Sequence, residues 1–179
     1  MLKGESINLQ AIEREDLKLL MLWRNLPNFR KHFREYREIN MAMQENWFTT
    51  KVLNDPNTLM FSIRRNSDSE LLGCCGLCYI NWINRHADLS LYIGWEETYI
   101  DEVGYAEESC NLLFNYAFNE LNLNKIWTEI YEFDTKKIDL YQKLGFQLDG
   151  KLRQNYYYNG QWWDSLLFSV LKKDWASEK

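Results

Sequence analysis

The sequence has no excess of positive charge. Its 21 lysine and arginine residues stand against 26 aspartate and glutamate residues, which gives a net charge of -5 and a pI near 5.2. Because nucleic acids are bound mainly by basic surfaces, this balance disfavours nucleic-acid binding. The sequence also lacks any apolar run near the ~20 residues that span a bilayer, and no apolar segment follows Met1–Glu5. We therefore expect a cytoplasmic protein without nucleic-acid or membrane partners.

Cysteine is scarce, and its spacing gives weak support to a metal site. Of the four cysteines, Cys75 and Cys78 have the C-x-x-C spacing found in zinc sites, with Cys74 beside them. These three residues fall in an apolar stretch, 71–80, whose period-two alternation sends Cys74 and Cys78 to one face of a strand and Cys75 to the other. Buried thiols in a strand explain the pattern better than a metal does, and we expect no metal.

No internal repeat, linker or low-complexity tract interrupts the 179 residues, a length usual for one domain. Apolar residues make up 46% and charged residues 26%, which is too apolar for a disordered chain. We therefore expect one domain over residues 1–179. Aromatic residues reach 16%, and such rings serve both in cores and at ligand or subunit surfaces.

Hydrophobic periodicity predicts a regular alternation of strands and helices. The predicted strands lie at 6–12, 59–64, 71–83, 88–93, 125–131, from 146 onward and at 162–171. The predicted helices lie at 13–23, around 29–33, at 41–52 after a cap at Asn40, at 104–121 and at 135–143. This order predicts an α/β sandwich in which helices cover both faces of one central sheet.

A series of short motifs occurs in a specific order through residues 88–175. They are Ala87-Asp88-Leu89, Tyr92-Ile93-Gly94, Gly104-Tyr105-Ala106-Glu107-Glu108, Leu112-Leu113, Tyr116-Ala117-Phe118, Leu123-Asn124-Lys125-Ile126 and the run from Ile138 to Phe146. In this order they resemble the acetyl-CoA-binding half of the GNAT superfamily, particularly its ribosomal-protein N-terminal and spermidine acetyltransferases. The first half resembles the same branch through Trp23-Arg24-Asn25 and Trp47-Phe48.

The resemblance implies a GNAT-like domain with a mixed central sheet and helices on both faces. It also implies transfer of an acetyl group from acetyl-CoA to a primary amine, by direct attack in a ternary complex and without a metal. The acceptor it implies is a small amine or polyamine, an amino sugar or a peptide N-terminus. The part of the chain from Leu19 to Ile63 resembles acetyltransferases that act on amino sugars of nucleotide-linked glycans.

The helix start at Gly104 suits a pyrophosphate, because unpaired N–H groups and the positive end of the helix dipole face the preceding loop. Glycine permits close backbone approach, and Ala106 leaves room. An ordinary glycine-started helix packed on a sheet would have the same sequence. Together with the resemblance, this predicts the following cofactor-binding residues: Tyr92, Ile93, Val103, Gly104, Tyr105, Ala106, Asp134, Lys137 and Lys143.

Two catalytic residues follow from the resemblance. It implies that Tyr141 faces the cofactor sulfur and protonates the leaving thiolate, since a phenol with a pKa near ~10 stays protonated at neutral pH. It implies that Asp88 takes the proton of the acceptor amine, directly or through water. His86, two residues earlier, is the rival base, because histidine titrates near neutral pH. A packing role for the tyrosine is the alternative.

The sequence departs from the family at the pyrophosphate loop, where Asp101 replaces the usual glutamine or arginine. Six acids crowd this loop and helix start: Glu96, Glu97, Asp101, Glu102, Glu107 and Glu108. They weaken cofactor binding unless they point to solvent, or they attract a cationic acceptor. Lys136, Lys137 or Lys143 would then supply the positive charge.

The alternative function is a GNAT-fold protein with a degenerate CoA site that acts as a non-catalytic binding protein. The aromatic residues 156–158 and 162–163 line an acceptor pocket, form the interface of a homodimer, or pack an edge strand. The sequence leaves these three readings open.

Overall fold

A computed structural model describes residues 1–177, with side chains described through Trp175. Eight strands form one sheet in the order β1-β2-β3-β4-β5-β6-β8-β7. Neighbouring strands are antiparallel except β5 and β6, which run parallel. The strands are β1 (Leu2–Lys3), β2 (Ile7–Ala11), β3 (Leu59–Arg65), β4 (Leu71–Asn81), β5 (His86–Ile93), β6 (Lys125–Tyr131), β7 (Gln147–Tyr158) and β8 (Gln161–Leu171).

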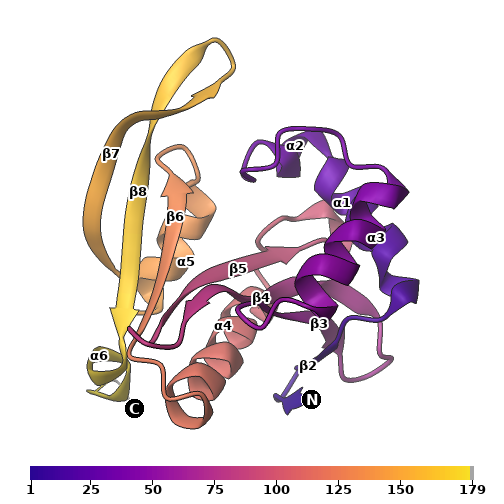
Figure 1. The fold of residues 1–179 in the computed structure, drawn as a ribbon, viewed down its shortest axis with the longest axis horizontal. Coiled ribbons are helices and arrows are strands. Elements are labelled where there is room, and N and C mark those ends of the chain that lie inside the picture. The colour runs from indigo at the N-terminus through magenta and orange to yellow at the C-terminus, as the bar shows by residue number, and fades with distance from the viewer. Residues whose placement is uncertain (178–179) are drawn as a thin grey trace.

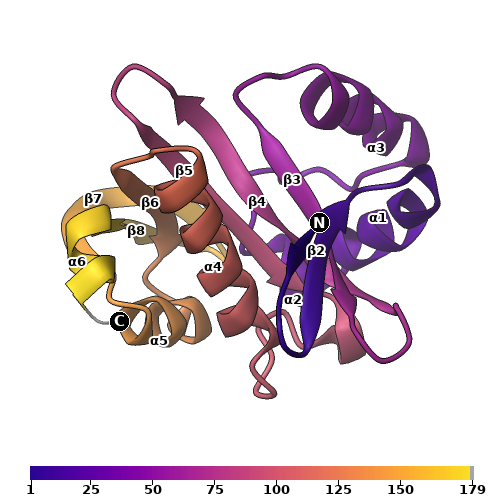
Figure 2. The same cartoon turned by 90° about the horizontal axis from the view of Figure 1, so that it is seen from below.

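Helices cover both faces of this sheet, which confirms the predicted α/β fold with a mixed sheet. They are α1 (Leu17–Asn25), α2 (Pro27–Arg30), α3 (Met41–Trp47), α4 (Tyr105–Asn115), α5 (Thr135–Lys143) and α6 (Lys172–Ser177). Figure 2 shows α1 and α3 on one side of β3 and β4, and α4 with α5 on the other. The sequence did not predict β1 or α6. No helix within residues 1–177 is long and apolar enough to cross a membrane.

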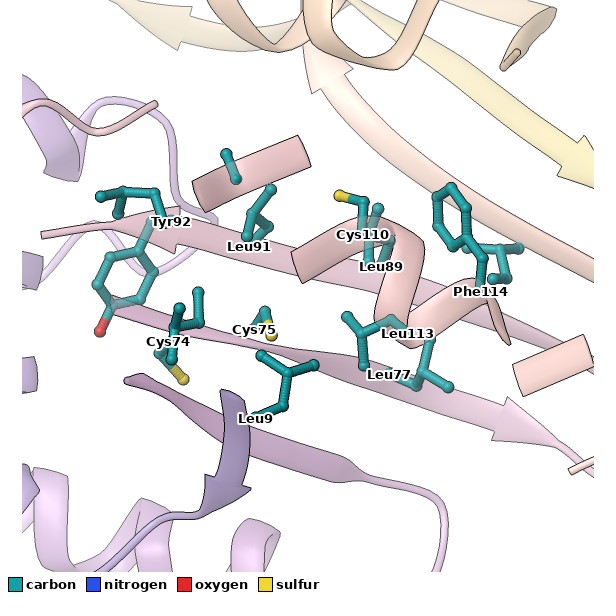
Figure 3. Packing of buried hydrophobic residues seen from close by; sticks show 14 of the residues in the cluster. Leu9, Cys74, Cys75, Leu77, Leu89, Leu91, Tyr92, Cys110, Leu113 and Phe114 are labelled. Carbon is teal, nitrogen blue, oxygen red and sulfur yellow. The ribbon is translucent and has the colours of Figure 1, made fainter. Parts of the chain in front are cut away.

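The core forms where α4 packs on β4 and β5, because apolar residues recur on one face of this helix and in both strands. Cys110 and Leu113 of α4 lie against Leu77 and Leu89 of the two strands (Figure 3). The predicted split of the cysteines is confirmed, since Cys74 and Cys78 line a cavity on the opposite face of the sheet, whereas Cys75 does not. All four cysteines are free thiols.

The parallel strands β5 and β6 separate soon after they meet. Their register pairs only 86–88 of β5 with 125–127 of β6, although β5 continues to Ile93 and β6 to Tyr131. Figure 1 shows the two strands diverging from a shared end, with β6 continuing beside β8. The edge of β5 from Leu89 onward is therefore not paired with β6. Asp88 stands at the point of separation.

The first helix is anchored at the far end of β5. A Cβ atom added to Gly94 would lie 1.9 Å from an atom of the Trp23 ring, so only glycine admits this contact. Since Trp23 belongs to α1, the close approach fixes α1 beside the start of the loop that leads to α4.

Candidate active site

A cavity of about 990 Å³ opens on the sheet face opposite α4. Its walls come from residues 24–51 on one side and from β4, β5 and β6 on the other, and we call it the main cavity. Residues from segments more than 100 positions apart meet there, including Arg24 near the start of the chain and Glu129 on β6. Its size is typical of small-molecule sites.

The Asp88 carboxylate lies in the wall of the main cavity and is only 6% exposed. Burial raises its pKa to about 6, and the Arg34 guanidinium, with Nη1 3.0 Å from Asp88 Oδ2, limits the rise. The same guanidinium lies 3.4 Å from the Glu129 carboxylate. A carboxylate with a pKa near 6 is ionised at neutral pH, and it can accept a proton more readily than an exposed aspartate.

His86 begins β5 two residues before Asp88, as the rival-base hypothesis requires. It lines a second, smaller cavity together with Trp82 and Ile83 rather than the main cavity. Its Nδ1 is buried and has no hydrogen-bond partner. The two candidate bases therefore line different cavities.

Tyr141 is completely buried on α5, and among the described residues its Oη makes no hydrogen bond of good geometry, although the Thr128 side chain lies near enough to oppose the rise in the pKa of the phenol. Burial raises the pKa of this phenol well above its ordinary value, so the hydroxyl keeps its proton. Its ring stacks on Phe146, with centroids 5.0 Å apart. It does not reach the wall of the main cavity, whereas Lys137, one turn earlier on α5, does. An unpaired buried donor is uncommon in proteins and marks a position where a bound molecule could supply the acceptor.

Three backbone N–H groups converge at the start of α4. Gly104 has φ +112°, and a Cβ added there would meet no atom within 4 Å, so the chain is open to an incoming group. The amides of Gly104 and Tyr105 donate to Asp101 Oδ2 at 2.6 and 2.8 Å, and the Ala106 amide donates to Asp101 Oδ1 at 2.8 Å. Val103, just before them, is 64% exposed. We call these three amides the amide cradle.

The cradle is thus suited to an anion, because a carboxylate already occupies it. The Asp101 side chain points at these amides and not to solvent. The expectation that the acids leave the phosphate-binding amides free is therefore not met at this residue. A pyrophosphate fits the same donors only after this carboxylate leaves them.

The lysines of α5 are placed differently from one another. Lys143 Nζ pairs with Glu107 at 2.6 Å, and Lys136 Nζ lies 3.4 and 3.3 Å from the carbonyl oxygens of Thr98 and Ile100. Lys137 is buried in the wall of the main cavity. None of the three contacts the amide cradle in the part of the chain that the structure describes.

Asp134 begins α5 and joins it to the loop before α4. Its Oδ1 accepts from the Lys137 amide at 3.2 Å, and its Oδ2 accepts from the Tyr99 hydroxyl at 2.8 Å. His32 Nδ1 lies 3.2 Å from the same Oδ2. Burial opposes ionisation of Asp134, but the His32, Lys137 and Tyr99 contacts together lower its pKa, so it remains a carboxylate.

The predicted backbone contacts on β5 come from Tyr92 and Ile93. The Ile93 amide already donates to the Tyr99 carbonyl at 2.8 Å, so this N–H is not free. Tyr92 is buried in the wall of the main cavity, and its ring meets Phe29 and Phe33 edge-on.

Sequence reasoning missed the charged residues that the first 51 positions bring to the main cavity. These are Arg24, His32, Arg34, Glu35, Arg37 and Lys51. The signal present was the dense run of charges at 30–38, but nothing local shows that it faces β5 and β6. The contact between Arg34 and Asp88 joins positions 54 apart.

Comparisons with known proteins find acetyltransferases. A family model described as an acetyltransferase (GNAT) domain matches residues 9–167. The chain is 27% identical over 176 residues to a spermidine N(1)-acetyltransferase of Escherichia coli K12, covering 98% of this chain and 91% of that protein. It is 31% identical over 112 residues to a putative ribosomal N-acetyltransferase of Bacillus subtilis, covering 63% and 60%. A spermidine N-acetyltransferase of Vibrio cholerae, solved with CoA and spermine, superposes with a TM-score of 0.87 at 25% identity over 97% of this chain and 99% of that one.

Proposed function

Since this chain belongs to the GNAT family of acetyltransferases, we propose that it transfers the acetyl group of acetyl-CoA to the primary amine of a small molecule held in the main cavity. Acetyl-CoA supplies the activated acetyl thioester, and we assign the proton transfers to Asp88 and Tyr141. The observation that carries the assignment is the position of Asp88, in the cavity wall at the point where β5 and β6 separate.

Asp88 accepts a proton from the acceptor. An alkylammonium group has an ordinary pKa near ~10.4, so at neutral pH it must lose a proton before its nitrogen can attack. An ionised carboxylate in the cavity wall takes that proton directly or through one water molecule. Arg34 positions the carboxylate from the opposite wall.

Tyr141 holds a proton at Oη for the departing sulfur. The raised pKa of this buried phenol keeps the hydroxyl protonated at neutral pH, and the same burial makes an unprotonated thiolate costly, so the proton moves to sulfur as the C–S bond breaks. The second proton that the nitrogen loses as the amide forms returns the tyrosine to its neutral form. The lack of a well-formed hydrogen bond at Oη supports this role, since only Thr128 lies nearby. Tyr141 does not line the main cavity, so the role requires that the cofactor sulfur reach the hydroxyl.

The amide cradle would hold the pyrophosphate, supported by Gly104, Tyr105 and Ala106. Asp101 must first swing away, so its carboxylate competes with the cofactor for the same donors. Asp134 and Lys137 act indirectly, through the start of α5 and the main cavity, and Lys143 is held by Glu107.

Titration calorimetry with acetyl-CoA tests the proposal, followed by an assay of CoA release with polyamines, amino sugars and peptide N-termini. We expect micromolar binding and turnover with at least one acceptor. The variant Asp101→Asn should bind acetyl-CoA about tenfold more tightly, or 1.4 kcal/mol, because its amide competes less well for the cradle than a carboxylate does. Glu102→Gln is the matched control, since Glu102 is exposed and contacts no cradle amide.

The second candidate is a non-catalytic binding protein, and the occupied cradle is the observation that favours it. Absence of acetyl-CoA binding in both the wild type and Asp101→Asn would establish this candidate and overturn the first. If only Asp101→Asn binds acetyl-CoA, the cofactor site is intact and the Asp101 carboxylate blocks it in the wild type.

We also propose that the protein forms a homodimer through the hairpin of β7 and β8. The hairpin projects away from the rest of the sheet in Figure 1, and β7 is exposed along most of its length. Tyr157 and Trp162 are 59% and 58% exposed, and large apolar surfaces of this kind usually meet a partner. Light scattering should give a mass above 21.7 kDa that falls to the monomer value in a Tyr157→Ser/Trp162→Ser double variant. A monomeric wild type would contradict the proposal.

A further inference from the structure

The charged residues of the main cavity do not balance. Its wall holds three acids, and each has an arginine partner. Arg34 pairs with Asp88 at 3.0 Å and with Glu129 at 3.4 Å, and Arg37 pairs with Glu35 at 2.7 Å. A further wall cation, Lys51, pairs with Asp55 at 3.0 Å.

Two wall cations remain without an anionic partner within 4.0 Å among residues 1–177, namely Arg24 and Lys137. The Arg24 guanidinium lies over the Phe33 ring, 4.0 Å from its centroid, and its Nε is buried without a hydrogen-bond partner. Lys137 is 7% exposed, and its Nζ faces the Tyr99 ring at 5.1 Å. The two side chains come from α1 and α5.

A buried lysine and a partly buried arginine without an anionic partner are costly, and two cations that face one space repel each other. Burial lowers the pKa of Lys137. The Asp134 and Asp88 carboxylates oppose this shift, whereas the positive charge of Arg24 adds to it, so the two cations influence one another. An anion bound between them would remove this cost. A lysine on the surface gains less from binding an anion, because water already solvates its charge.

We propose that the acceptor is a primary amine that also carries an anionic group, a carboxylate or a phosphate, bound by Arg24 and Lys137. The inference rests on the proposed function and adds the class of acceptor. The anionic group orients the molecule so that its amine lies at Asp88, whose carboxylate stands in the same wall. A polyamine, by contrast, brings several positive charges to a wall that already holds two unpaired ones, so this cavity discriminates against it.

Matched acceptors test the inference through the release of CoA. Ethanolamine is compared with phosphoethanolamine, propylamine with β-alanine, and glucosamine with glucosamine 6-phosphate, alongside spermidine. We expect at least one anionic member to exceed its partner without the anion, which carries only the ammonium charge, at least tenfold in kcat/KM. The phosphate and carboxylate pairs identify which anion the site takes.

Variants then locate the site. Arg24→Gln should raise KM for the preferred anionic acceptor tenfold or more while leaving KM for the partner that lacks the anion unchanged. Lys137→Gln should raise the ratio of these two KM values tenfold or more, since the partner corrects for the effect of Lys137 on the Asp88 base. Arg24→Lys keeps the charge but not the planar fork, so it should lose less affinity than Arg24→Gln. Arg30→Gln is the matched control, because Arg30 follows closely in sequence, pairs only loosely with Glu38 at 3.9 Å and does not line the cavity. Calorimetry of the acceptor with protein saturated with CoA gives the same comparison without turnover.

The inference would be overturned if spermidine were the best acceptor. It would also be overturned if the variants raised KM equally for the anionic acceptor and for its partner without the anion. If Arg24→Gln or Lys137→Gln changes the dissociation constant of acetyl-CoA instead, the replaced cation binds the cofactor, and its proposed role in binding the acceptor is overturned. Wild-type protein that binds no acetyl-CoA would refute the proposed function itself, which is a separate outcome.

Discussion

Replacing Tyr141 with phenylalanine is expected to lower kcat by about 10²- to 10⁴-fold, the range that general-acid catalysis supplies. The change removes one oxygen from a fully buried residue whose hydroxyl makes no hydrogen bond of good geometry among the described residues and has only Thr128 nearby. The departing thiolate then lacks a positioned proton. Steady-state assays at saturating acetyl-CoA and acceptor measure the effect.

The same variant should fold and bind normally, because phenylalanine keeps the stacking on Phe146. We expect an unchanged melting temperature and an acetyl-CoA dissociation constant within about twofold, a difference of less than ~0.5 kcal/mol. Tyr116→Phe serves as the control, since Tyr116 packs on Phe61 and does not line the main cavity. Normal turnover in Tyr141→Phe would leave the tyrosine a packing residue.

Replacing Asp88 with asparagine is expected to lower kcat/KM by about 10²- to 10⁴-fold at neutral pH, because asparagine cannot accept the proton of the amine. The wild-type profile should rise with pH through the Asp88 pKa of about 6 and then level off. Below that pH the carboxyl is protonated and inactive as a base, and above it the carboxylate is available. In Asp88→Asn this rise should disappear.

The groups that face Asp88 set this pKa. Arg34 lowers it from the segment after α2, Lys137 lowers it from α5, and Glu129 raises it from β6, while Cys78 of β4 lies close by. Burial outweighs them. Arg34→Gln should therefore move the rise to higher pH, which a purely structural ion pair would not do.

His86→Gln is the control for the base. His86 lines the second cavity, so its removal should leave the pH profile unchanged. A rise that persists in Asp88→Asn and vanishes in His86→Gln would transfer the role to His86. If it persists in both variants, a water molecule delivers the proton to solvent.

Local patterns predicted most of the fold. The alternation in 71–80 predicted both the strand β4 and the opposite faces of Cys74 and Cys75, because successive side chains of a strand point to opposite sides. Asn40 was predicted to cap α3, and its Oδ1 accepts from the Met43 amide at 2.9 Å. The two short terminal elements were missed, because β1 has two residues and gives no periodicity.

The candidate site was predicted only in part. The motifs brought Asp88, Gly104 and Tyr141 into consideration. The structure places Asp88 in the cavity wall, Gly104 at a cradle that Asp101 occupies, and Tyr141 outside the cavity lining, and the roles of all three stay predictions. The acidic loop was a sequence observation, but its occupation of the amide cradle was not. Asp101 lies only three to five residues from its donors, yet the contact depends on the positive φ of Gly104 and on how the loop folds over β5.

The sequence by itself determined the order of strands and helices, the faces they bury and the family, since each of these depends on residues close together in the chain. Only the tertiary structure decided the charge of the main cavity. Arg34 neutralises Asp88 across 54 positions, while Arg24 and Lys137, far apart in the sequence, line the same cavity. Coulomb interactions depend on distance in space and on burial, and the order of strands in the sheet sets both.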